Sequence, residues 1–316
     1  MKSVASAPGK VILFGEHFVV YGIKAILCAI DKRITATTQL LEEKSIRIKS
    51  QLGNAELGID ELSNQDAVSM RFMKPFFHIV NATLEKFGQN KGMEIVIRSE
   101  IPAGIGLGSS SAACVAVAAS VSALFGKIPK EEILKMAIEA ERIIFAEASG
   151  ADSAVSTFGG LMSYDKNGFD KITCTNDFNL VIANSKQIHT TREIVMRVRE
   201  FKRKNEDLFL KLCKQETEIV NDALSALEKN DLNNLGLLMS KNQELLDTIK
   251  VSTDRLDLLI SEAKKTSYGA KITGAGGGGC IISLVDKSNL DTTVENLRKI
   301  SECFIARTDY NGLNYL

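Results

Sequence analysis

Residues 102–112, PAGIGLGSSSA, decide the fold of this chain. They follow the strand-like run MEIVIRSEI (93–101) and lead into SSSAACVAVAASVSALFG (109–126), a small-residue apolar run typical of a buried helix packed on a sheet. Alternate glycines allow close approach of the backbone to a bulky group, and the helix start adds unpaired amides and a positive dipole end. No GK[ST] follows, so the segment is not a Walker A loop. The sequence predicts a phosphate-binding loop; a serine-capped flexible turn is the alternative.

The rest of the chain alternates strand-like and helix-like segments, which indicates an α+β fold rather than a doubly wound α/β fold. We place a boundary between residues 165 and 180, giving an N-terminal domain at 1–170 and a C-terminal domain at 171–316. Predicted strands lie within 3–52 and at 93–101, 160–164, 179–185, 270–273, 280–285 and 303–307. Predicted helices lie at 66–87 (capped by Asp66), 109–126, 129 to about 148, 192–265 with a break near Asn230, and 289–300.

Composition narrows the class of protein. The chain has 316 residues, about two domains' worth, with 45% apolar and 25% charged residues. The formal net charge of zero argues against a nucleic-acid or anionic-membrane binder. We also expect no membrane span, because no window approaches about 18 uninterrupted apolar residues, and no signal peptide. Six singly placed cysteines favour reduced thiols and a cytoplasmic protein, and three distant histidines leave little for a zinc site.

A second glycine-rich segment, KITGAGGGGC, covers residues 271–280. Gly274, Gly276 and Gly279 satisfy GxGxxG, but a dinucleotide-binding loop must open a helix, whereas CIISLV here predicts a strand. We therefore expect a strand–loop–strand element that covers a site or approaches a ligand closely. A mobile hairpin turn is the alternative.

Two acidic residues are candidates for chemistry. Glu141 lies on a predicted helix and Asp152 follows the break at residues 149–150, so a turn can bring both carboxylates to one site. One carboxylate could hold a metal ion while the other accepts a proton or orients a hydroxyl. Glu147 is interpreted as a solvated helix acid, and the spacing alone leaves that alternative open for the other two.

The N-terminal segment APGKVILFGEH (7–17) predicts a strand flanked by Lys10 and by Glu16 and His17. If the strand is regular, its alternation places Lys10 and Glu16 on one face. An edge strand with solvated ends is the alternative.

Three segments follow one another along the chain: APGKVILFGEH (7–17), PAGIGLGSSSA (102–112) and KITGAGGGGC (271–280). In this order they resemble the signature motifs of the GHMP small-molecule kinases, a superfamily that includes galactokinases, homoserine kinases, mevalonate kinases and phosphomevalonate kinases. The resemblance spans nearly the whole chain. Within the superfamily, KVILFGEHFVVYG (10–22) and SGADSAVSTFGG (149–160) are most similar to the mevalonate kinases. The resemblance implies a two-domain fold with mixed and antiparallel sheets and an active site between the domains.

The resemblance also implies roles on the phosphate side. Asp152 would be the catalytic base or the carboxylate that orients the hydroxyl, and Lys10 would lie beside it. Ser110 and Glu141 would hold Mg²⁺ on the phosphates of ATP. The nucleotide-binding loop would comprise Pro102, Ala103, Gly104, Ile105, Gly106, Leu107, Gly108, Ser109, Ser110, Ser111 and Ala112.

On the acceptor side, Glu16, His17 and Thr191 would face mevalonate, and Gly276 and Gly277 would line the opposite wall. The implied reaction is transfer of the γ-phosphoryl group of ATP to the 5-hydroxyl of (R)-mevalonate, a step of isoprenoid biosynthesis. The implied partners are these small molecules, with no nucleic acid or membrane. Dimers are common in the superfamily, so a homodimer is among the expected assemblies.

Two departures from the family pattern bear on the acceptor. Residues 145–148 read FAEA where the family often has HGxP, and Ser153 stands where Asn usually follows the aspartate. The alternatives are a related kinase acting on another alcohol such as phosphomevalonate, and a catalytically silent ATP-binding sensor. The presence of Lys10, Ser110, Glu141 and Asp152 together argues against the sensor.

Overall fold

The computed structural model describes residues 1–316 except 63, 65–69, 147, 175–177 and 189. The α-helices are α1 (Lys74–Phe87), α2 (Ser109–Ala123), α3 (Lys130–Arg142), α4 (Ala151–Phe158), α5 (Thr191–Lys204), α6 (Glu206–Glu228), α7 (Leu232–Thr248), α8 (Asp254–Lys264) and α9 (Leu290–Arg298). Short 3₁₀ helices include η1 (Phe18–Tyr21) and η4 (Arg71–Met73). The strands are β1 (Lys2–Phe14), β2 (Ala25–Leu40), β3 (Ser45–Ser50), β4 (Gly53–Gly58), β5 (Met93–Ser99), β6 (Leu161–Asp165), β7 (Gly168–Ile172), β8 (Asn179–Asn184), β9 (Gly269–Thr273), β10 (Cys280–Val285), β11 (Cys303–Arg307) and β12 (Asn314–Tyr315).

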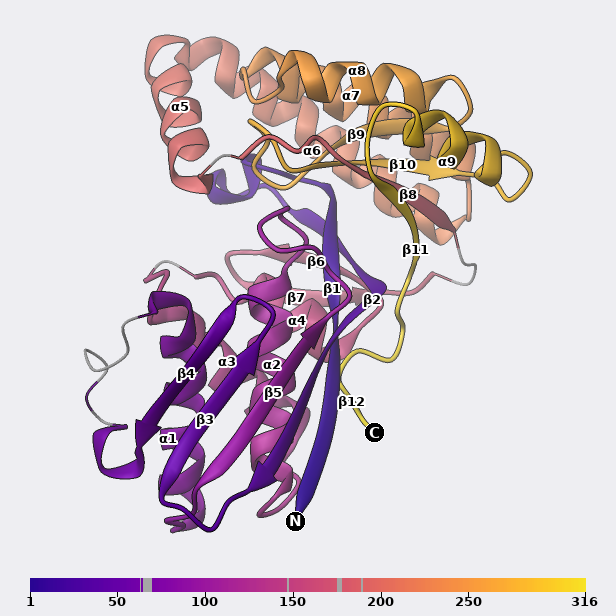
Figure 1. Ribbon diagram of the computed structural model, residues 1–316. Coiled ribbons are helices and arrows are strands. Elements are labelled where there is room, and N and C mark those ends of the chain that lie inside the picture. Colours follow the sequence, from indigo (N-terminus) through magenta and orange to yellow (C-terminus); the bar gives the residue numbers. More distant parts are fainter. Residues whose placement is uncertain (63, 65–69, 147, 175–177, 189) are drawn as a thin grey trace.

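The larger sheet belongs mainly to the first half of the chain. Its strand order is β12-β1-β2-β5-β3-β4, with β6 paired to β2 and β7 paired to β6. The β3–β5 pair is parallel and the other pairs are antiparallel. Helices α1 to α4 lie together on one face of this sheet (Figure 1). The long strands β1 and β2 extend past the other strands of this sheet and reach the second half of the molecule (Figure 1).

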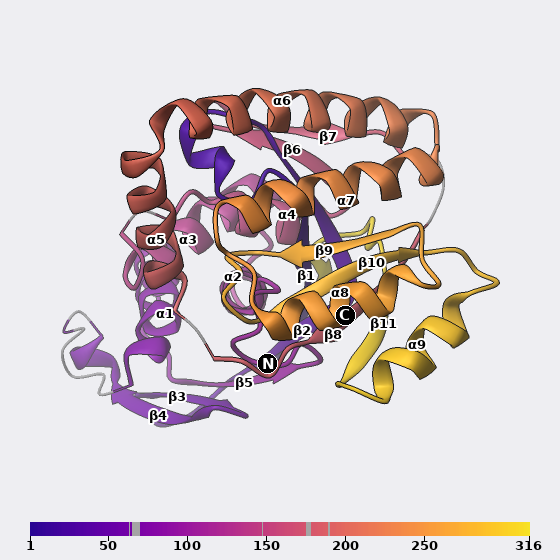
Figure 2. The ribbon, with the colours of Figure 1, turned by 90° about the horizontal axis from the view of Figure 1, so that it is seen from above.

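The smaller sheet is antiparallel with the order β11-β8-β10-β9. Helices α7 and α8 pack on this sheet, and α6 runs alongside α7 (Figure 2). The chain then returns to the larger sheet, where β12 pairs with β1. The larger sheet is therefore not built from residues 1–170 alone.

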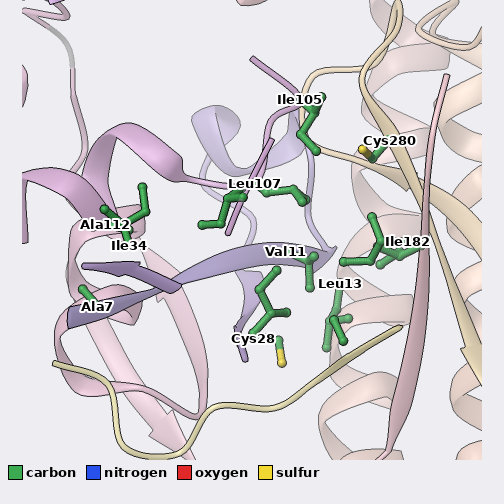
Figure 3. Close-up of a cluster of buried hydrophobic side chains, with 14 of the residues drawn as sticks. Ala7, Val11, Leu13, Cys28, Ile34, Ile105, Leu107, Ala112, Ile182 and Cys280 are labelled. Atoms are coloured by element: carbon green, nitrogen blue, oxygen red, sulfur yellow. The ribbon is translucent and has the colours of Figure 1, made fainter. Parts of the chain in front are cut away.

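One hydrophobic core joins the two sheets. Helix α2 is buried nearly all round, because Ala, Ser, Cys and Val side chains allow the helix to pack closely against β1 and β2. Figure 3 shows the core continuing from Val11 and Leu13 on β1 to Ile182 and Cys280 on the smaller sheet. A continuous core of this kind holds both halves in a fixed relation beneath the glycine-rich loops.

The α+β class and the strand–loop–helix junction at 93–123 are confirmed, as is the strand after the second glycine segment. The helix predicted to run to about residue 148 is wrong: α3 ends at Arg142, and Gly150, at φ 82°, turns the chain into the unpredicted α4. The region 192–265 forms four helices with further breaks near 205 and 249–253, rather than two. Residues Asp66 and Glu147 lie outside the described residues. Across the described ranges, no helix is long and apolar enough to cross a membrane.

Candidate active site

The centre of the site is an ion pair between β1 and α4. Lys10 Nζ lies 3.1 Å from Asp152 Oδ2. The Lys10 side chain is buried, whereas that of Asp152 is 38% exposed. The pair therefore presents its carboxylate to solvent and keeps its ammonium beneath. Gly108 packs on Lys10, and a Cβ there would lie 2.8 Å from the lysine Cγ, so only glycine lets the loop approach this closely.

Glu141 lies beside this pair, near the end of α3. It is buried, and its two carboxylate oxygens accept hydrogen bonds from Ser111 and Ser153, the latter at 2.8 Å. Burial raises the pKa of Glu141; the two serine hydroxyls oppose that shift, and the charge of Asp152 adds to it. The sequence placed Ser111 only in the nucleotide loop and gave Ser153 no role. The two serines fix the carboxylate of Glu141 in orientation.

The loop 102–112 packs on these residues, because Gly108 contacts Lys10 and Ser111 bonds to Glu141. Gly104, Gly106 and Gly108 have φ values of 75°, 83° and 71°, a left-handed backbone that glycine adopts without strain. The loop is tied to β1 by the Lys10 amide, which donates to the Leu107 carbonyl at 2.9 Å. Ser110, in the first turn of α2, is exposed. The loop thus leaves the start of α2, with its unpaired amides, open to a ligand.

A cavity of about 370 Å³ opens beside this loop. The loop supplies one wall, and apolar side chains of the larger sheet and the α1 region supply most of the rest. Its lining comprises Ile34, Ser50, Gln51, Leu52, Phe72, Phe76, Ile97, Ser99, Glu100, Ile101, Pro102, Ala103, Gly104, Ser109, Ser110 and Ala113.

The second glycine-rich segment meets both other motifs. Thr273 Oγ1 accepts from the Ile12 amide at 2.9 Å and donates to the Ile12 carbonyl at 3.1 Å. A Cβ placed on Gly274 would lie 3.8 Å from the Gly106 carbonyl oxygen, so the two glycine loops face each other. The Gly277 amide donates to the Val251 carbonyl at 2.7 Å. The segment is the loop between the antiparallel strands β9 and β10, and the Gly277 bond ties that loop to Val251.

The turn after β1 differs from the expected regular strand. The strand ends at Phe14 and Gly15 has φ 94°, so Glu16 does not continue the face that carries Lys10. Glu16 is buried, and its carboxylate pairs with Lys271 on β9. His17, at φ 62°, directs Nε2 to the Ala275 carbonyl at 2.7 Å. Burial lowers the pKa of His17, which keeps the ring neutral with its proton on Nε2.

Glu216, which the sequence predictions missed, borders this turn. Glu216 on α6 accepts from the Gly15 amide at 2.9 Å and from the Asn242 side chain at 2.7 Å. Burial, with the charge of Glu16 adding to it, raises the pKa of Glu216 to about 7. A signal existed: Glu216 falls on the helical stripe of buried residues that includes Phe209, Leu212, Ile219, Val220 and Ala223.

Thr191 is the exception among the candidates. It is the first residue of α5 and is exposed. In the described parts of the chain it makes no hydrogen bond with the other candidate residues. The structure therefore brings together Lys10, Glu16, His17, Glu141 and Asp152 with both glycine loops, whereas Thr191 has no hydrogen bond to them among the described residues.

Comparison with known proteins shows the family of this chain. The family model for the GHMP kinases N terminal domain matches residues 74–160, and that for the GHMP kinases C terminal matches residues 223–302. The mevalonate kinase of Pyrococcus furiosus is 36% identical over 301 residues, covering 90% of this chain and 89% of that protein. The mevalonate kinase of Archaeoglobus fulgidus is 37% identical over 290 residues, covering 89% and 92%.

Two solved structures of mevalonate kinases are similar to this chain in fold. The crystal structure of the Methanococcus jannaschii mevalonate kinase superposes with a TM-score of 0.87 at 30% identity, covering 98% of each chain. The crystal structure of L. major mevalonate kinase in complex with R-mevalonate gives a TM-score of 0.84 at 26% identity, covering 96% of this chain and 95% of that one. This chain therefore belongs to the GHMP kinase family.

Proposed function

We propose that the protein is an ATP-dependent mevalonate kinase, which transfers the γ-phosphoryl group of ATP to the 5-hydroxyl of (R)-mevalonate. The observation that carries the proposal is the Lys10–Asp152 pair, with the oriented carboxylate of Glu141 beside it, beneath a glycine loop at a helix start. The choice of mevalonate rests on relatives that are mevalonate kinases over about 90% of this chain. The site would lie between domains at 1–170 and 171–316.

Phosphoryl transfer to an alcohol requires in-line placement and charge neutralisation rather than a covalent intermediate. The mevalonate hydroxyl oxygen forms the new bond to the γ-phosphorus, the bond to the β–γ bridging oxygen breaks, and ADP leaves. The Asp152 carboxylate would accept the hydroxyl proton, because it is the more exposed member of the pair. The Lys10 ammonium would offset negative charge on the transferring group.

The nucleotide would lie along the loop 102–112. The open first turn of α2 supplies amides and a positive dipole end for the phosphates. The adjoining cavity of about 370 Å³, walled by Leu52, Phe72 and Ile97, suits a flat apolar base. This orientation directs the triphosphate from the cavity toward Asp152.

A magnesium ion fits the donors at this site. Mg²⁺ usually binds one or two carboxylates together with substrate phosphates and water, so it needs no dedicated all-protein cage. Within the described ranges no group of three or more His, Cys, Asp or Glu side chains could hold a metal alone. Glu141 and Ser110 would hold the ion, which would neutralise phosphate charge when bound. The serine bonds to Glu141 keep its carboxylate oriented for that role.

The acceptor would occupy the space bounded by His17, the turn at Gly276 and Gly277, and Asp152. His17 and Ala275 are already joined at 2.7 Å, which gives the acceptor side a rigid wall. Thr191 would contribute from the start of α5. The described cysteines are all free, which fits a reducing compartment such as the cytoplasm.

An ADP-release assay with mevalonate, phosphomevalonate, homoserine and galactose tests the substrate. We expect kcat/KM for mevalonate to exceed kcat/KM for every other acceptor by at least about tenfold. That ratio corresponds to about 1.4 kcal/mol of difference in transition-state stabilisation. A clear preference for phosphomevalonate would replace the proposal with the related kinase. ATP binding without phosphorylation of any acceptor would favour the sensor.

The metal assignment has its own test. Glu141→Gln and Ser110→Ala should raise the Mg²⁺ concentration needed for half-maximal rate and lower kcat, because the first replaces a carboxylate ligand by a neutral amide and the second removes a hydroxyl ligand. Glu139→Gln, an exposed acid on the same helix, is the matched control. Wild-type Mg²⁺ titrations in both test variants would refute the assignment.

A further inference from the structure

Three charged side chains are buried together where the two halves of the chain meet. Glu16, Lys271 and Glu216 are each at most 1% exposed. The Lys271 ammonium pairs with Glu16 Oε1 and also donates to the Ile272 carbonyl at 2.6 Å. Glu216 comes from a third element, α6, and none of the phosphoryl-transfer steps above uses it.

The cluster holds two acids and one base. Burying an uncompensated charge is costly, so the cluster is neutral only when one acid keeps its proton. Lys271 is bound to Glu16, whereas Glu216 receives only neutral donors, the Gly15 amide and the Asn242 side chain. The proton therefore belongs on Glu216, and the pKa of about 7 for that carboxyl agrees with this assignment.

The Asn242 amide offers an acceptor for that proton. Its Oδ1 is buried without a hydrogen-bond partner, while its Nδ2 donates to Glu216 Oε2. The oxygen and nitrogen of an amide exchange places on a half-turn, so a protonated Glu216 Oε2 can donate to Asn242 Oδ1. An ionised Glu216 cannot satisfy that oxygen.

We propose that Glu216 is a positioning residue for the acceptor side of the site: as an uncharged acid it holds the Gly15 amide and so fixes the turn that carries Glu16 and His17. Glu16 then acts through Lys271 rather than by touching the acceptor. This inference rests on the proposed function for its kinetic consequence but not for its structural one.

The contacts of the turn explain how one hydrogen bond reaches the site. A Cβ on Gly15 would lie 2.5 Å from the Ala25 Cα, so the turn lies directly against the start of β2. Two residues later, His17 bonds to Ala275 in the second glycine loop. A displacement at Gly15 therefore moves both the histidine and the wall that faces the acceptor.

Ionisation of Glu216 would loosen this arrangement. A second buried anion repels Glu16 and competes with it for Lys271. Apart from Glu16 and Lys271, other charged or titratable groups act on the cluster that contains Glu216. Lys10 attracts Glu16, His17 is neutral, and Cys213 lies one turn before Glu216 on α6. Burial lowers the pKa of His17 and raises the pKa of Cys213, so neither group gains charge while Glu216, with a pKa of about 7, loses its proton.

Two substitutions at Glu216 separate the hydrogen bond from the charge. Glu216→Ala removes the acceptor for the Gly15 amide, whereas Glu216→Gln keeps an oxygen for it and stays uncharged at every pH. Glu218→Gln, on the exposed face of α6, is the matched control. We would measure kcat and the KM for mevalonate and for ATP at pH 6.5 and pH 8.5. Amide hydrogen exchange of the peptide around Gly15, normalised to the control, reports the turn without any substrate.

The expected kinetic pattern is specific to the acceptor. Glu216→Ala should raise the mevalonate KM about tenfold, the effect of one lost buried hydrogen bond, with the ATP KM changed less than about twofold. The wild type should show a rise in mevalonate KM between pH 6.5 and pH 8.5 that Glu216→Gln lacks. Equal changes in both KM values, or the same pH profile in wild type and Glu216→Gln, would overturn the inference.

The exchange measurement distinguishes this inference from the proposed function. Glu216→Ala should speed exchange around Gly15 about tenfold or more, while Glu216→Gln and the control keep the wild-type rate at pH 6.5. If the wild type does not phosphorylate mevalonate, the proposed function fails, and the exchange pattern alone upholds or refutes the positioning role. Unchanged exchange in Glu216→Ala refutes it in either case.

Discussion

Replacing Glu216 by glutamine should change how the stability of the protein depends on pH. Burial raises the pKa of this carboxyl from its ordinary 4.5 to about 7 in the folded chain. The folded protein therefore binds the proton more tightly than the unfolded chain does. An acid of this kind lowers the free energy of unfolding as the pH rises from about 4.5 to about 7, the reverse of an exposed, salt-bridged carboxylate. Glutamine has no proton to lose, so the variant lacks this dependence.

The magnitude follows from the size of the pKa difference. Each unit corresponds to about 1.4 kcal/mol, so the whole window is worth about 3 kcal/mol and the part between pH 5 and pH 8 about 2.5 kcal/mol. The glutamine oxygen still accepts from the Gly15 amide, and its nitrogen can donate to the free Asn242 Oδ1 once that amide turns. The variant should therefore match the wild type near pH 5 and exceed its stability at pH 8.

Thermal unfolding at matched pH values measures the effect. For a chain of this length, about 2.5 kcal/mol corresponds to a relative shift in Tm of about 4 °C between pH 5 and pH 8. Glu218→Gln, exposed on the same helix, should show no such divergence from the wild type. If the Tm difference between Glu216→Gln and the wild type is the same at both pH values, Glu216 is ionised like an ordinary acid and the reasoning is wrong.

Three further outcomes are expected. Asp152→Asn should lower kcat by roughly 10²–10⁴ with little change in ATP affinity, and retention of more than about a tenth of the wild-type kcat in the ADP-release assay would exclude it as the base. Lys10→Met should also lower kcat, and the double variant should lose less than the product of the single effects, because the two groups are 3.1 Å apart and act together. Gly276→Ala should lower the free energy of unfolding by about 2 kcal/mol or more, since at φ 74° its Cβ would collide with the Val251 carbonyl. Gly22→Ala, at φ 90° with nothing near its Cβ, measures the backbone strain alone, and equal losses in the two alanine variants would show that the collision has no cost.

The parts of the site that the sequence predicted are those whose signals are local. Loop 102–112 was found because a strand pattern, alternate glycines and a helix start follow one another along the chain. The second glycine segment was separated from a dinucleotide-binding loop by the strand that follows it. Glu141 and Asp152 were marked as a pair because only a turn separates them, although α4 itself was missed.

The parts that were missed depend on contacts between distant residues. Ser111 and Ser153 orient Glu141 from positions 30 and 12 residues away. A regular strand would place Glu16 on the face of Lys10, but the left-handed Gly15 ends the strand pattern and the Glu16 carboxylate pairs with Lys271, 255 residues later. Glu216 falls on the apolar stripe of α6, but an acid at such a position is usually solvated, so the stripe alone does not predict its burial.

The sequence by itself determined the α+β class and the two glycine loops, because periodicity and glycine placement act over a few neighbouring residues. The roles expected in phosphoryl transfer came from the resemblance to the GHMP kinases. Only the tertiary structure decided which charges meet. The Lys10–Asp152 pair and the cluster of Glu16, Lys271 and Glu216 arise where β1, α4, α6 and β9 converge. Burial there sets which groups carry charge, since the cost of removing an ion from water depends on all of its neighbours in space and not on its neighbours in the chain.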